Sequence, residues 1–324
     1  MAAFLARRLA QGLAVVALVA TIVFFLIHSA PGDPFSASME NPGISESIRA
    51  NWRQAYGLDR PLAEQYVRYV GSIARGDLGF SFSQRRPVRD ALAAALPNTL
   101  LLMSIAIVAA FAVGIAVAVA QVRKRGKFGD RLLGGISILL FSVPDFWLAM
   151  LVLTSLAYWM RWFPIGGSVD PGAYDTMGAA ARVADRLYHL VLPSLTLALL
   201  YFPVIARHQR AALLESISSD YITTARAKGV TERVIVTRHA LRNALLPIVT
   251  ILGVAFPALL TGAVFVEKIF GWPGMGLLIV NSIGSRDYPL LTAAVLLAST
   301  FVVLGSVLSD VLYRWLDPRL HSDR

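Results

Sequence analysis

The sequence predicts an all-α integral membrane protein with six transmembrane helices and a small helical external segment between the first and second helices. Of its 324 residues, 56% are hydrophobic and 15% are charged, whereas about a quarter of the residues of a soluble domain are charged. The mean hydropathy is +0.62. Several apolar runs reach the roughly 20 residues that cross a hydrocarbon core about 30 Å thick. Separated runs of this kind satisfy their backbone hydrogen bonds in lipid only as helices, and the alternating pattern of barrel strands does not occur.

Six runs are apolar enough to be these helices. They are Leu9–Ile27, Thr99–Ala120, Leu133–Trp159, Leu190–Ile205, Leu245–Val266 and Leu290–Leu312. The first follows Arg7 and Arg8, as the apolar part of a cleavable signal peptide would. It is longer than the roughly 7–15 residues of such a peptide, and His28 stands where cleavage needs a small residue. We therefore expect an uncleaved first helix.

Lys and Arg residues mark the loops expected on the cytoplasmic side. They are Arg123, Lys124, Arg125, Lys127 and Arg131 in one short loop, and Arg207, Arg210, Arg226, Lys228, Arg233, Arg238 and Arg242 in another. Basic short loops stay in the cytoplasm, so threading six spans places both termini there. The net charge of +10 then reflects membrane topology, and no nucleic-acid partner is expected.

These features divide the chain into three predicted parts. Residues 1–29 form the N-terminus and first transmembrane helix, 30–97 an external helical cap or loop, and 98–324 a core of five helices that contains a cytoplasmic loop at 206–244. Within the external part, the stretch "PLAEQYVRYVGSIARG" has apolar residues at helical spacing, and Pro61 suits a first-turn position. The alternative for this part is a solvated linker.

The cytoplasmic loop contains a polar, basic segment, 214–232, with helical periodicity. Leu214, Ile217, Tyr221, Ile222, Ala225 and Lys228 recur at a spacing of three and four residues. Gly229 follows the last of them, where a left-handed turn favours glycine, and Thr231 is expected to cap a second helix. Such a helix–turn–helix either lies on lipid headgroups or docks into a partner's groove. The small residues beside Gly229 favour close approach by a protein.

This segment resembles the cytoplasmic coupling loop of ABC-transporter permeases, with its EAA–x3–G pattern. Thr223, Thr224 and Ala225 are followed after three residues by Gly229, although the leading glutamate is absent and Arg242 stands where many relatives have proline. Eight further stretches, in order, are similar to the dipeptide, oligopeptide and nickel permease branch. They are "FLARRLAQ…APGDP", "YGLDRPLAEQYVRYV", "RGDLGFSFSQRRPV", "VPDFWLAMLV", "HALRNALLPIVT", "VEKIFGWPGMGLL", "RDYPLL" and "LSDVLYRWLDPR".

The resemblance implies the membrane domain of a type I ABC importer in a bacterial inner membrane, carrying di- or oligopeptides, with nickel, glutathione or oligosaccharides as alternatives. It implies a second, homologous permease as partner, two ATPase subunits, an extracytoplasmic solute-binding protein and membrane lipids. The residues implied to couple to an ATPase are Tyr221, Thr223, Thr224, Ala225, Arg226, Lys228 and Gly229.

No motif for covalent chemistry or nucleotide binding occurs in the sequence. Gly126-Lys127 is followed by Phe128 and lacks the upstream glycine of a P-loop. The five histidines show no metal-binding spacing, no G-x-S-x-G elbow occurs, and there is no cysteine. We expect a translocation subunit that is not an enzyme and has no cofactor of its own, with ATP and Mg²⁺ held by partner ATPases.

Three residues are candidates for the translocation pathway or its gate. Asp145 interrupts the third predicted span beside Pro144, where a charge is costly unless it faces a cavity or partner. It either lines the pathway or makes an inter-helix hydrogen bond at a proline kink. Trp272 and Gly274 lie in "EKIFGWPGMGLLI", which is either an external gate element or an ordinary turn with an aromatic anchor. An ion-coupled secondary transporter is the remaining rival, although the other five spans carry no central charge.

Overall fold

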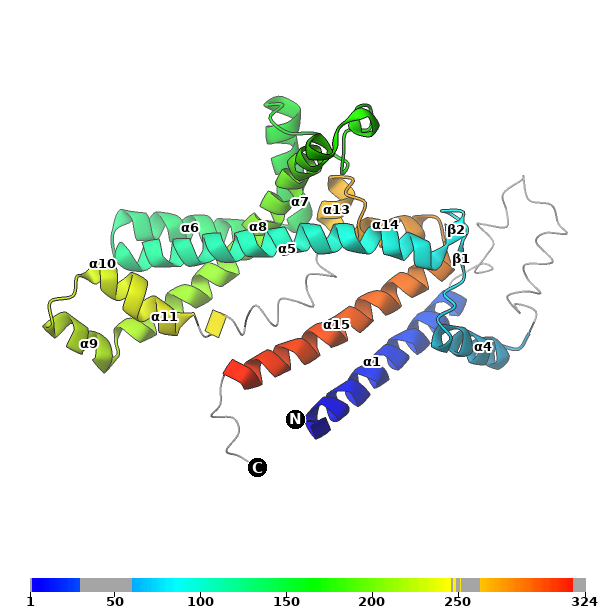
Figure 1. Ribbon diagram of the computed structural model, residues 1–324, viewed down its shortest axis with the longest axis horizontal. Coiled ribbons are helices and arrows are strands. Elements are labelled where there is room, and N and C mark those ends of the chain that lie inside the picture. The colour runs from blue at the N-terminus through cyan, green and yellow to red at the C-terminus, as the bar shows by residue number, and fades with distance from the viewer. Residues whose placement is uncertain (1, 30–59, 246, 249–250, 252–262, 317–324) are drawn as a thin grey trace. The chain divides into compact units, whose positions relative to one another are not determined.

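The computed structural model describes residues 2–29, 60–245, 247–248, 251 and 263–316, which form helices, their connections and one short hairpin. Figure 1 follows the order of the elements by colour, from α1 in blue to α15 in red. Contacts divide the chain into two compact units. One consists of Met1–Asn98 and Gly274–Leu304, and the other of Thr99–Pro273 and Gly305–Arg324. The predicted three-part division of the sequence stays a prediction.

The first unit contains the N-terminal end of the described chain and a later stretch, Gly274–Leu304. Its elements are α1 (Ala2–Ser29), α4 (Leu62–Ala74), β1 (Phe80–Ser81), β2 (Arg86–Pro87), the beginning of α5 (Val88–Arg123), α14 (Met275–Gly284) and most of α15 (Tyr288–Leu316). The two strands pair antiparallel, with Phe80 opposite Pro87, so the fold is helical apart from this minimal hairpin. The core of the unit joins the start of α5 to α14 and α15 through Val88, Ala91, Leu92, Ala95, Met275, Leu278, Leu290, Ala293 and Ala294.

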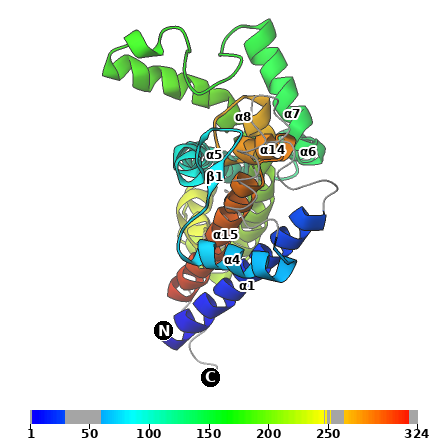
Figure 2. The same ribbon diagram turned by 90° about the vertical axis from the view of Figure 1, so that its right-hand side faces the viewer.

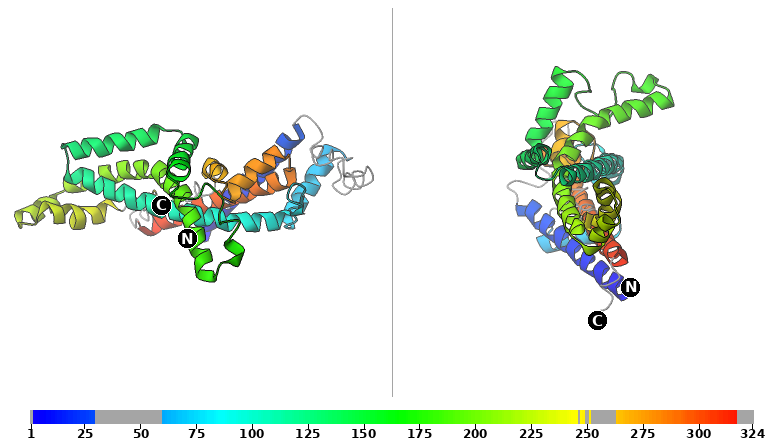
Figure 3. Two further views of the ribbon diagram at one scale, coloured as in Figure 1. Left: turned by 90° about the horizontal axis from the view of Figure 1, so that it is seen from above. Right: turned by 90° about the vertical axis from the view of Figure 1, so that its left-hand side faces the viewer.

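The second unit contains the remaining helices. They are most of α5, α6 (Phe128–Ser142), α7 (Asp145–Val152), the π-helix η1 (Leu153–Trp159), the 3₁₀-helix η2 (Tyr174–Thr176), α8 (Ala179–Ile217), α9 (Asp220–Ala227), α10 (Glu232–Val234), the π-helix η3 (Ile235–Ala240), α11 (Leu241–Ala244) and α13 (Val264–Ile269). α6 packs along α8, and α7 contacts both α8 and α13. In the view from above, α9 and α10 lie at the tip beyond the end of α8 (Figure 3).

Four described helices are long and apolar enough to cross a membrane: Ala6–Ser29, Val88–Arg123, Ala179–Ile217 and Tyr288–Val307, and a bent pair makes a fifth if it counts as one span. They coincide with the first, second, fourth and sixth predicted spans. The predicted fifth span, Leu245–Val266, lies largely outside the described residues. A helical membrane protein is therefore confirmed. α8 extends more than ten residues beyond the predicted start of its span, from Leu190 back to Ala179.

The third predicted span, Leu133–Trp159, was wrong as a single helix. α6 ends at Ser142, and the continuation through α7 and η1 is bent by 109°. Pro144 lacks an amide hydrogen and its ring crowds the residue before it. Val143 accordingly has extended angles (φ −83°, ψ 132°) that end the helix. Asp145 thus lies in the first turn of a new helix, and not within a continuous span.

The continuous periodicity predicted through 214–228 is also broken. α8 ends at Ile217, Ser219 is extended (ψ 154°), and α9 begins at Asp220. The Ser218 hydroxyl donates to the Glu215 carbonyl oxygen at 2.7 Å. Serine side chains that bond the backbone in this way compete with the helical ladder. The predicted apolar face is therefore shared between the end of α8 and α9.

The predicted external helix is present as α4, which crosses the end of α1 (Figure 2). Pro61 occupies its N-cap position, one residue earlier than predicted. The Tyr66 hydroxyl lies 2.8 Å from that of Thr21 on α1, and Tyr69 donates to the Ala20 carbonyl oxygen at 3.4 Å. The preceding stretch "ESIRANWRQAYGL" lies outside the described residues.

Candidate functional site

The predicted coupling residues lie on a hairpin of two short helices, residues 220–234, which we term the α9–α10 hairpin. Gly229 has φ +79°, as predicted for a left-handed position. Its amide donates to the Arg226 carbonyl oxygen at 2.9 Å, and the Val230 amide donates to that of Ala225 at 3.2 Å. This is the paired bond pattern of a Schellman turn. Thr231 takes the predicted N-cap position of α10, but its side chain makes no capping hydrogen bond.

One apolar side chain fixes the hairpin to the membrane helices. Ile222 is fully buried. It belongs to a cluster drawn from α5, α8, η3 and α11, which consists of Ala118, Val122, Leu213, Ile222, Ile235, Val236, Ala240 and Ala244. The Tyr221 hydroxyl lies 2.5 Å from that of Ser216, which also donates to the Ala240 carbonyl oxygen at 3.2 Å. The hairpin therefore has a firm base on α8 and η3.

The other face of the hairpin is open. Thr223, Thr224, Arg226, Lys228 and Gly229 are exposed, whereas Ala225 is half-buried. Tyr221 keeps 41% of its surface exposed despite its bond to Ser216. A Cβ placed on Gly229 would meet nothing within 4 Å. The structure thus brings the predicted residues together on one exposed, small-residue ridge, a surface suited to contact with another macromolecule.

An ion pair closes the hairpin across its turn. Arg226 Nε lies 2.6 Å from Glu232 Oε1, and a second contact joins Nη2 to Oε2 at 3.4 Å. The hydrogen bond from Arg226 lowers the pKa of Glu232, and the same bond raises the pKa of Arg226. Both groups are solvent-exposed, so the pair contributes little to the free energy of unfolding. It joins the two sides of the turn. Arg226 is engaged within the chain, which the sequence did not reveal.

The three predicted pathway residues have different surroundings. Asp145 is exposed at the start of α7 and close enough to Tyr201 on α8 to interact with it electrostatically. Trp272 is fully buried, so it is not an aromatic anchor facing lipid. Gly274 is buried at the N-cap of α14. Their roles in a pathway or gate stay predictions.

The stretch around Trp272 forms a second turn of the same kind as that at Gly229. Gly271 has φ +61°. Its amide donates to the Lys268 carbonyl oxygen at 3.4 Å and the Trp272 amide donates to that of Glu267 at 2.9 Å, again the Schellman pattern. The Gly167 amide also donates to the Phe270 carbonyl oxygen at 2.9 Å, which ties the turn to the loop after η1.

Two buried carboxylates, Glu267 and Asp287, were not predicted from the sequence. Glu267 accepts a hydrogen bond from the Thr99 hydroxyl at 2.6 Å, with both residues buried. Asp287 Oδ2 accepts from the Ser81 hydroxyl at 2.6 Å and from the amide and hydroxyl of Ser83 at 2.9 and 2.7 Å. Its other oxygen accepts from the Leu290 amide at the start of α15. An acidic residue just before an apolar helix is an N-cap signal that could have identified Asp287.

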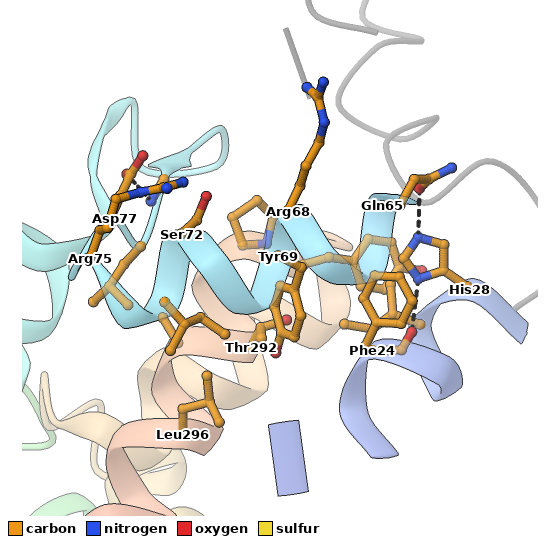
Figure 4. Close-up of a pocket in the computed structure, with 17 residues that line it drawn as sticks. Phe24, His28, Gln65, Arg68, Tyr69, Ser72, Arg75, Asp77, Thr292 and Leu296 are labelled. Carbon is orange, nitrogen blue, oxygen red and sulfur yellow. Dashed lines mark hydrogen bonds between the residues drawn. The ribbon is translucent and has the colours of Figure 1, made fainter. Parts of the chain in front are cut away.

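A cavity of about 360 Å³ lies beside α4 within the first unit. Figure 4 shows Phe24 and His28 from α1, Tyr69 from α4, Arg75 just after it, and Thr292 and Leu296 from α15 around the cavity. Burial, with a contribution from Tyr66, raises the pKa of Tyr69 to about 12. The residues that line it include aromatic, aliphatic and polar side chains, so the cavity suits an amphipathic molecule. Across the described residues, no group of three His, Asp or Glu side chains is arranged to hold a metal ion.

Comparisons with known proteins cover nearly the whole chain. Residues 110–322 match the family of binding-protein-dependent transport system inner membrane components, and residues 1–103 match the N-terminal family of such membrane components. The oligopeptide transport system permease protein AppB of Bacillus subtilis is 35% identical over 99% of both chains. The dipeptide transport system permease protein DppB of Escherichia coli is 34% identical over 98% of both.

Two further comparisons concern substrate and fold. The glutathione transport system permease protein GsiC of Salmonella paratyphi A is 38% identical over 98% of both chains. Among solved structures, an inward-facing MetNI methionine ABC transporter matches with a TM-score of 0.55 at 19% identity, over 70% of this chain and 96% of the other. At that identity the likeness supports the fold of an ABC importer's membrane domain, and nothing about substrate.

Proposed function

The chain belongs to the family of binding-protein-dependent transport system inner membrane components, and from that premise we propose that it is the permease subunit of an ATP-driven importer of di- or oligopeptides. Such a component is a multi-pass inner membrane protein and the transport subunit, not the ATPase. The predictions of the family and of a chain that is not an enzyme are thereby confirmed. Partnership with an ATPase and a binding protein follows from the family in general terms.

The α9–α10 hairpin is the observation that carries the proposal. It offers an exposed ridge of small and basic residues on a base buried around Ile222. A lipid-binding helix would present bulky apolar residues outward, whereas Thr223, Thr224 and Gly229 lie outward here. The ridge suits a cleft on an ATPase subunit, with Lys228 available for acidic groups there.

The buried base supplies a route for force. Ile222 packs in the same cluster as Val122 of α5 and Leu213 of α8. Movement of the hairpin with a closing ATPase would be passed to these two long helices, because a packed cluster moves as a unit. Differential binding of the ATPases to two packings of the helices would then shift the population between outward-open and inward-open states.

The finer assignments belong to this proposal as well. We place six transmembrane helices in the membrane, with both termini cytoplasmic, and pair this chain with a second, homologous permease. Two ATPase subunits hold ATP and Mg²⁺, so this chain needs no cofactor, and an extracytoplasmic binding protein delivers the cargo. Asp145, beside the break between α6 and α7, would attract a cationic group such as a peptide's amino terminus.

Glutathione is the second candidate cargo, and it is itself a tripeptide. The relative named for glutathione transport is 38% identical, against 34–35% for those named for dipeptide and oligopeptide transport. A gap of this size does not separate the two, and both cargoes present a free amino group and carboxylates. None of the relatives described above is named for the transport of nickel chelates or oligosaccharides.

Reconstitution tests the proposal directly. The chain is purified with its companion subunits and placed in vesicles, with ATP on the side of the membrane where the ATPases lie. Binding protein and radiolabelled di-, tri- and hexapeptides or glutathione are added on the other side. We expect uptake that needs ATP and is abolished by an ATPase-inactive partner. Uptake by the purified chain alone, driven by an ion gradient, would establish the secondary transporter instead.

A further inference from the structure

A second cavity lies within the unit Thr99–Pro273, where α6 runs along α8. Its volume is about 380 Å³, and it is separate from the hairpin and from the pathway candidates. One end is polar and is formed by Asp130, Arg131, Arg207 and Arg210. The other end is apolar and includes Ile138 and Phe141 of α6 and Val204 of α8. The cavity is therefore amphipathic along its length.

The polar end has more positive charge than it can neutralise. Asp130 is buried, and its two carboxylate oxygens lie 3.3 and 3.2 Å from Arg210 Nη2. It also accepts from the Gly126 amide at 3.1 Å. Three arginines and one aspartate leave a net charge of +2 at the cavity, with Arg131 and Arg207 exposed at its mouth.

Arg210 adds a donor in need of an acceptor. Its Nε is buried and makes no hydrogen bond within the part of the chain that the structure describes. Buried donors nearly always have a partner, because leaving one without an acceptor is unfavourable. An anionic oxygen in the cavity would satisfy this donor and balance the excess charge at the same time.

The spacing of the lining residues matches one leaflet of a bilayer. Arg131 and Phe141 are ten residues apart on α6, which corresponds to roughly 15 Å along a helix, half of a hydrocarbon core about 30 Å thick. Ile136, Leu139 and Phe141 are exposed on the same helix. With the basic loop at the cytoplasmic surface, as the proposed function has it, the arginines lie at headgroup depth and the apolar end at acyl-chain depth.

We propose that this cavity binds an anionic phospholipid of the cytoplasmic leaflet. The phosphate lies among Arg131, Arg207 and Arg210, and one acyl chain follows Ile138 and Phe141. Basic pockets between transmembrane helices on the cytoplasmic side suit such headgroups. A zwitterionic lipid has the same phosphate but also a cation that the arginines repel, so the site selects lipids with net negative charge.

Lipid titration of the purified full-length chain, followed by native mass spectrometry, tests the site. Dioleoyl phosphatidylglycerol is expected to bind at least tenfold more tightly than dioleoyl phosphatidylcholine. Because each arginine near an anionic headgroup contributes about fivefold, the double variant R131Q/R207Q should weaken phosphatidylglycerol binding by about 25-fold. Both arginines are exposed, so the variant should fold.

The matched control is R123Q/R125Q, which removes the same charge from the adjacent loop without touching the cavity and should change affinity less than twofold. Equal losses in the two double variants would show general surface attraction and overturn the proposal. Displacement of the lipid by millimolar glycerol phosphate would identify a soluble phosphate site instead. Since the chain has no native cysteine, a Ser137→Cys variant gives a unique thiol in the cavity. Its cross-linking to the second permease in the intact transporter would show a protein interface and also overturn the proposal.

Discussion

The turns at Gly229 and Gly271 have the same backbone geometry and opposite surroundings. Both place a glycine in the left-handed region after a short helix, and both make the paired Schellman hydrogen bonds. At Gly229 the neighbouring polar residues are exposed, and the apolar residue that follows, Val230, is half-buried. At Gly271 the residue that follows is Trp272, which is fully buried. At Gly229 the residues around the glycine are presented outward, whereas at Gly271 the glycine is exposed and the residue after it belongs to the interior.

This difference separates a docking element from a structural one. The α9–α10 hairpin is held through Ile222, Val230 and the bond of Tyr221 to Ser216, which leaves its ridge available. The turn at Gly271 is tied to Gly167 through the Phe270 carbonyl oxygen, and the helix before it carries the buried Glu267. Substitutions at the two turns should therefore affect different measurements, coupling in one case and stability in the other.

Removing the apolar residue after each glycine gives the largest expected contrast. Trp272→Ala should destabilise the purified protein by about 3–5 kcal/mol, because a large buried side chain leaves a cavity. Val230→Ala removes less area from a half-buried position and should cost about 1 kcal/mol. Thermal unfolding in detergent measures both. Equal effects would show that the buried and exposed environments assigned to the two turns are wrong.

Replacing each glycine with valine sharpens the contrast. Both variants strain a left-handed residue by about 1–2 kcal/mol. Gly271→Val should lower the unfolding temperature through this strain, with its Cβ 3.6 Å from the Gly167 amide nitrogen. Gly229→Val has open space around it, so it should lose no more stability than this strain costs. It should keep membrane insertion and raise the ATP hydrolysed per molecule imported.

The ratio of ATP hydrolysis to uptake in reconstituted vesicles is the readout for Gly229→Val, with Gly126→Val as the control. Gly126 also has positive φ and open space, but it lies in a different loop, between α5 and α6. Loss of coupling in both variants would point to a general effect of loop strain. Unchanged coupling in Gly229→Val would remove the turn from the mechanism.

The ion pair between Arg226 and Glu232 has the smallest expected effect. The pKa of Glu232 is lowered by Arg226, so the pair contributes at pH values above the ordinary glutamate pKa of about 4.3 and is lost as the pH falls through the lowered pKa. At pH 6–8 Arg226→Gln should leave the unfolding temperature unchanged and reduce coupled uptake slightly. The exchange R226E/E232R should restore uptake. If the exchange is worse than either single variant, Arg226 contacts the partner and not Glu232.

The sequence was sufficient for features that depend on composition and local backbone chemistry. Four apolar runs became long helices, and Gly229 took the left-handed position because only glycine has no Cβ to strain there. α4 followed from its helical spacing. These predictions needed no knowledge of which residues meet in space.

Predictions that depended on tertiary contacts were incomplete. The sequence predicted one continuous span through Pro144, whereas α6 ends before this proline and the chain bends by 109°. The sequence left Trp272 open as a gate residue or an aromatic anchor, and its full burial was not predicted because burial depends on distant chain segments. The partners of Asp287 lie more than 200 residues away at Ser81 and Ser83. Periodicity carries no information about such pairs, nor about the contact of Arg226 with Glu232 across the turn.

Cross-linking from the exposed ridge tests the central claim most directly. A Thr224→Cys variant gives a unique thiol on the α9–α10 hairpin, and Thr176→Cys on η2, expected on the opposite side of the membrane, is the control. In the assembled transporter, we predict that a short linker, with a maleimide at one end and a photoreactive benzophenone at the other, joins Thr224→Cys to an ATPase subunit in a nucleotide-sensitive manner and leaves the control unlinked. A Thr224→Cys thiol that reacts freely with soluble reagent in the assembled complex, and never links to an ATPase, would contradict the account.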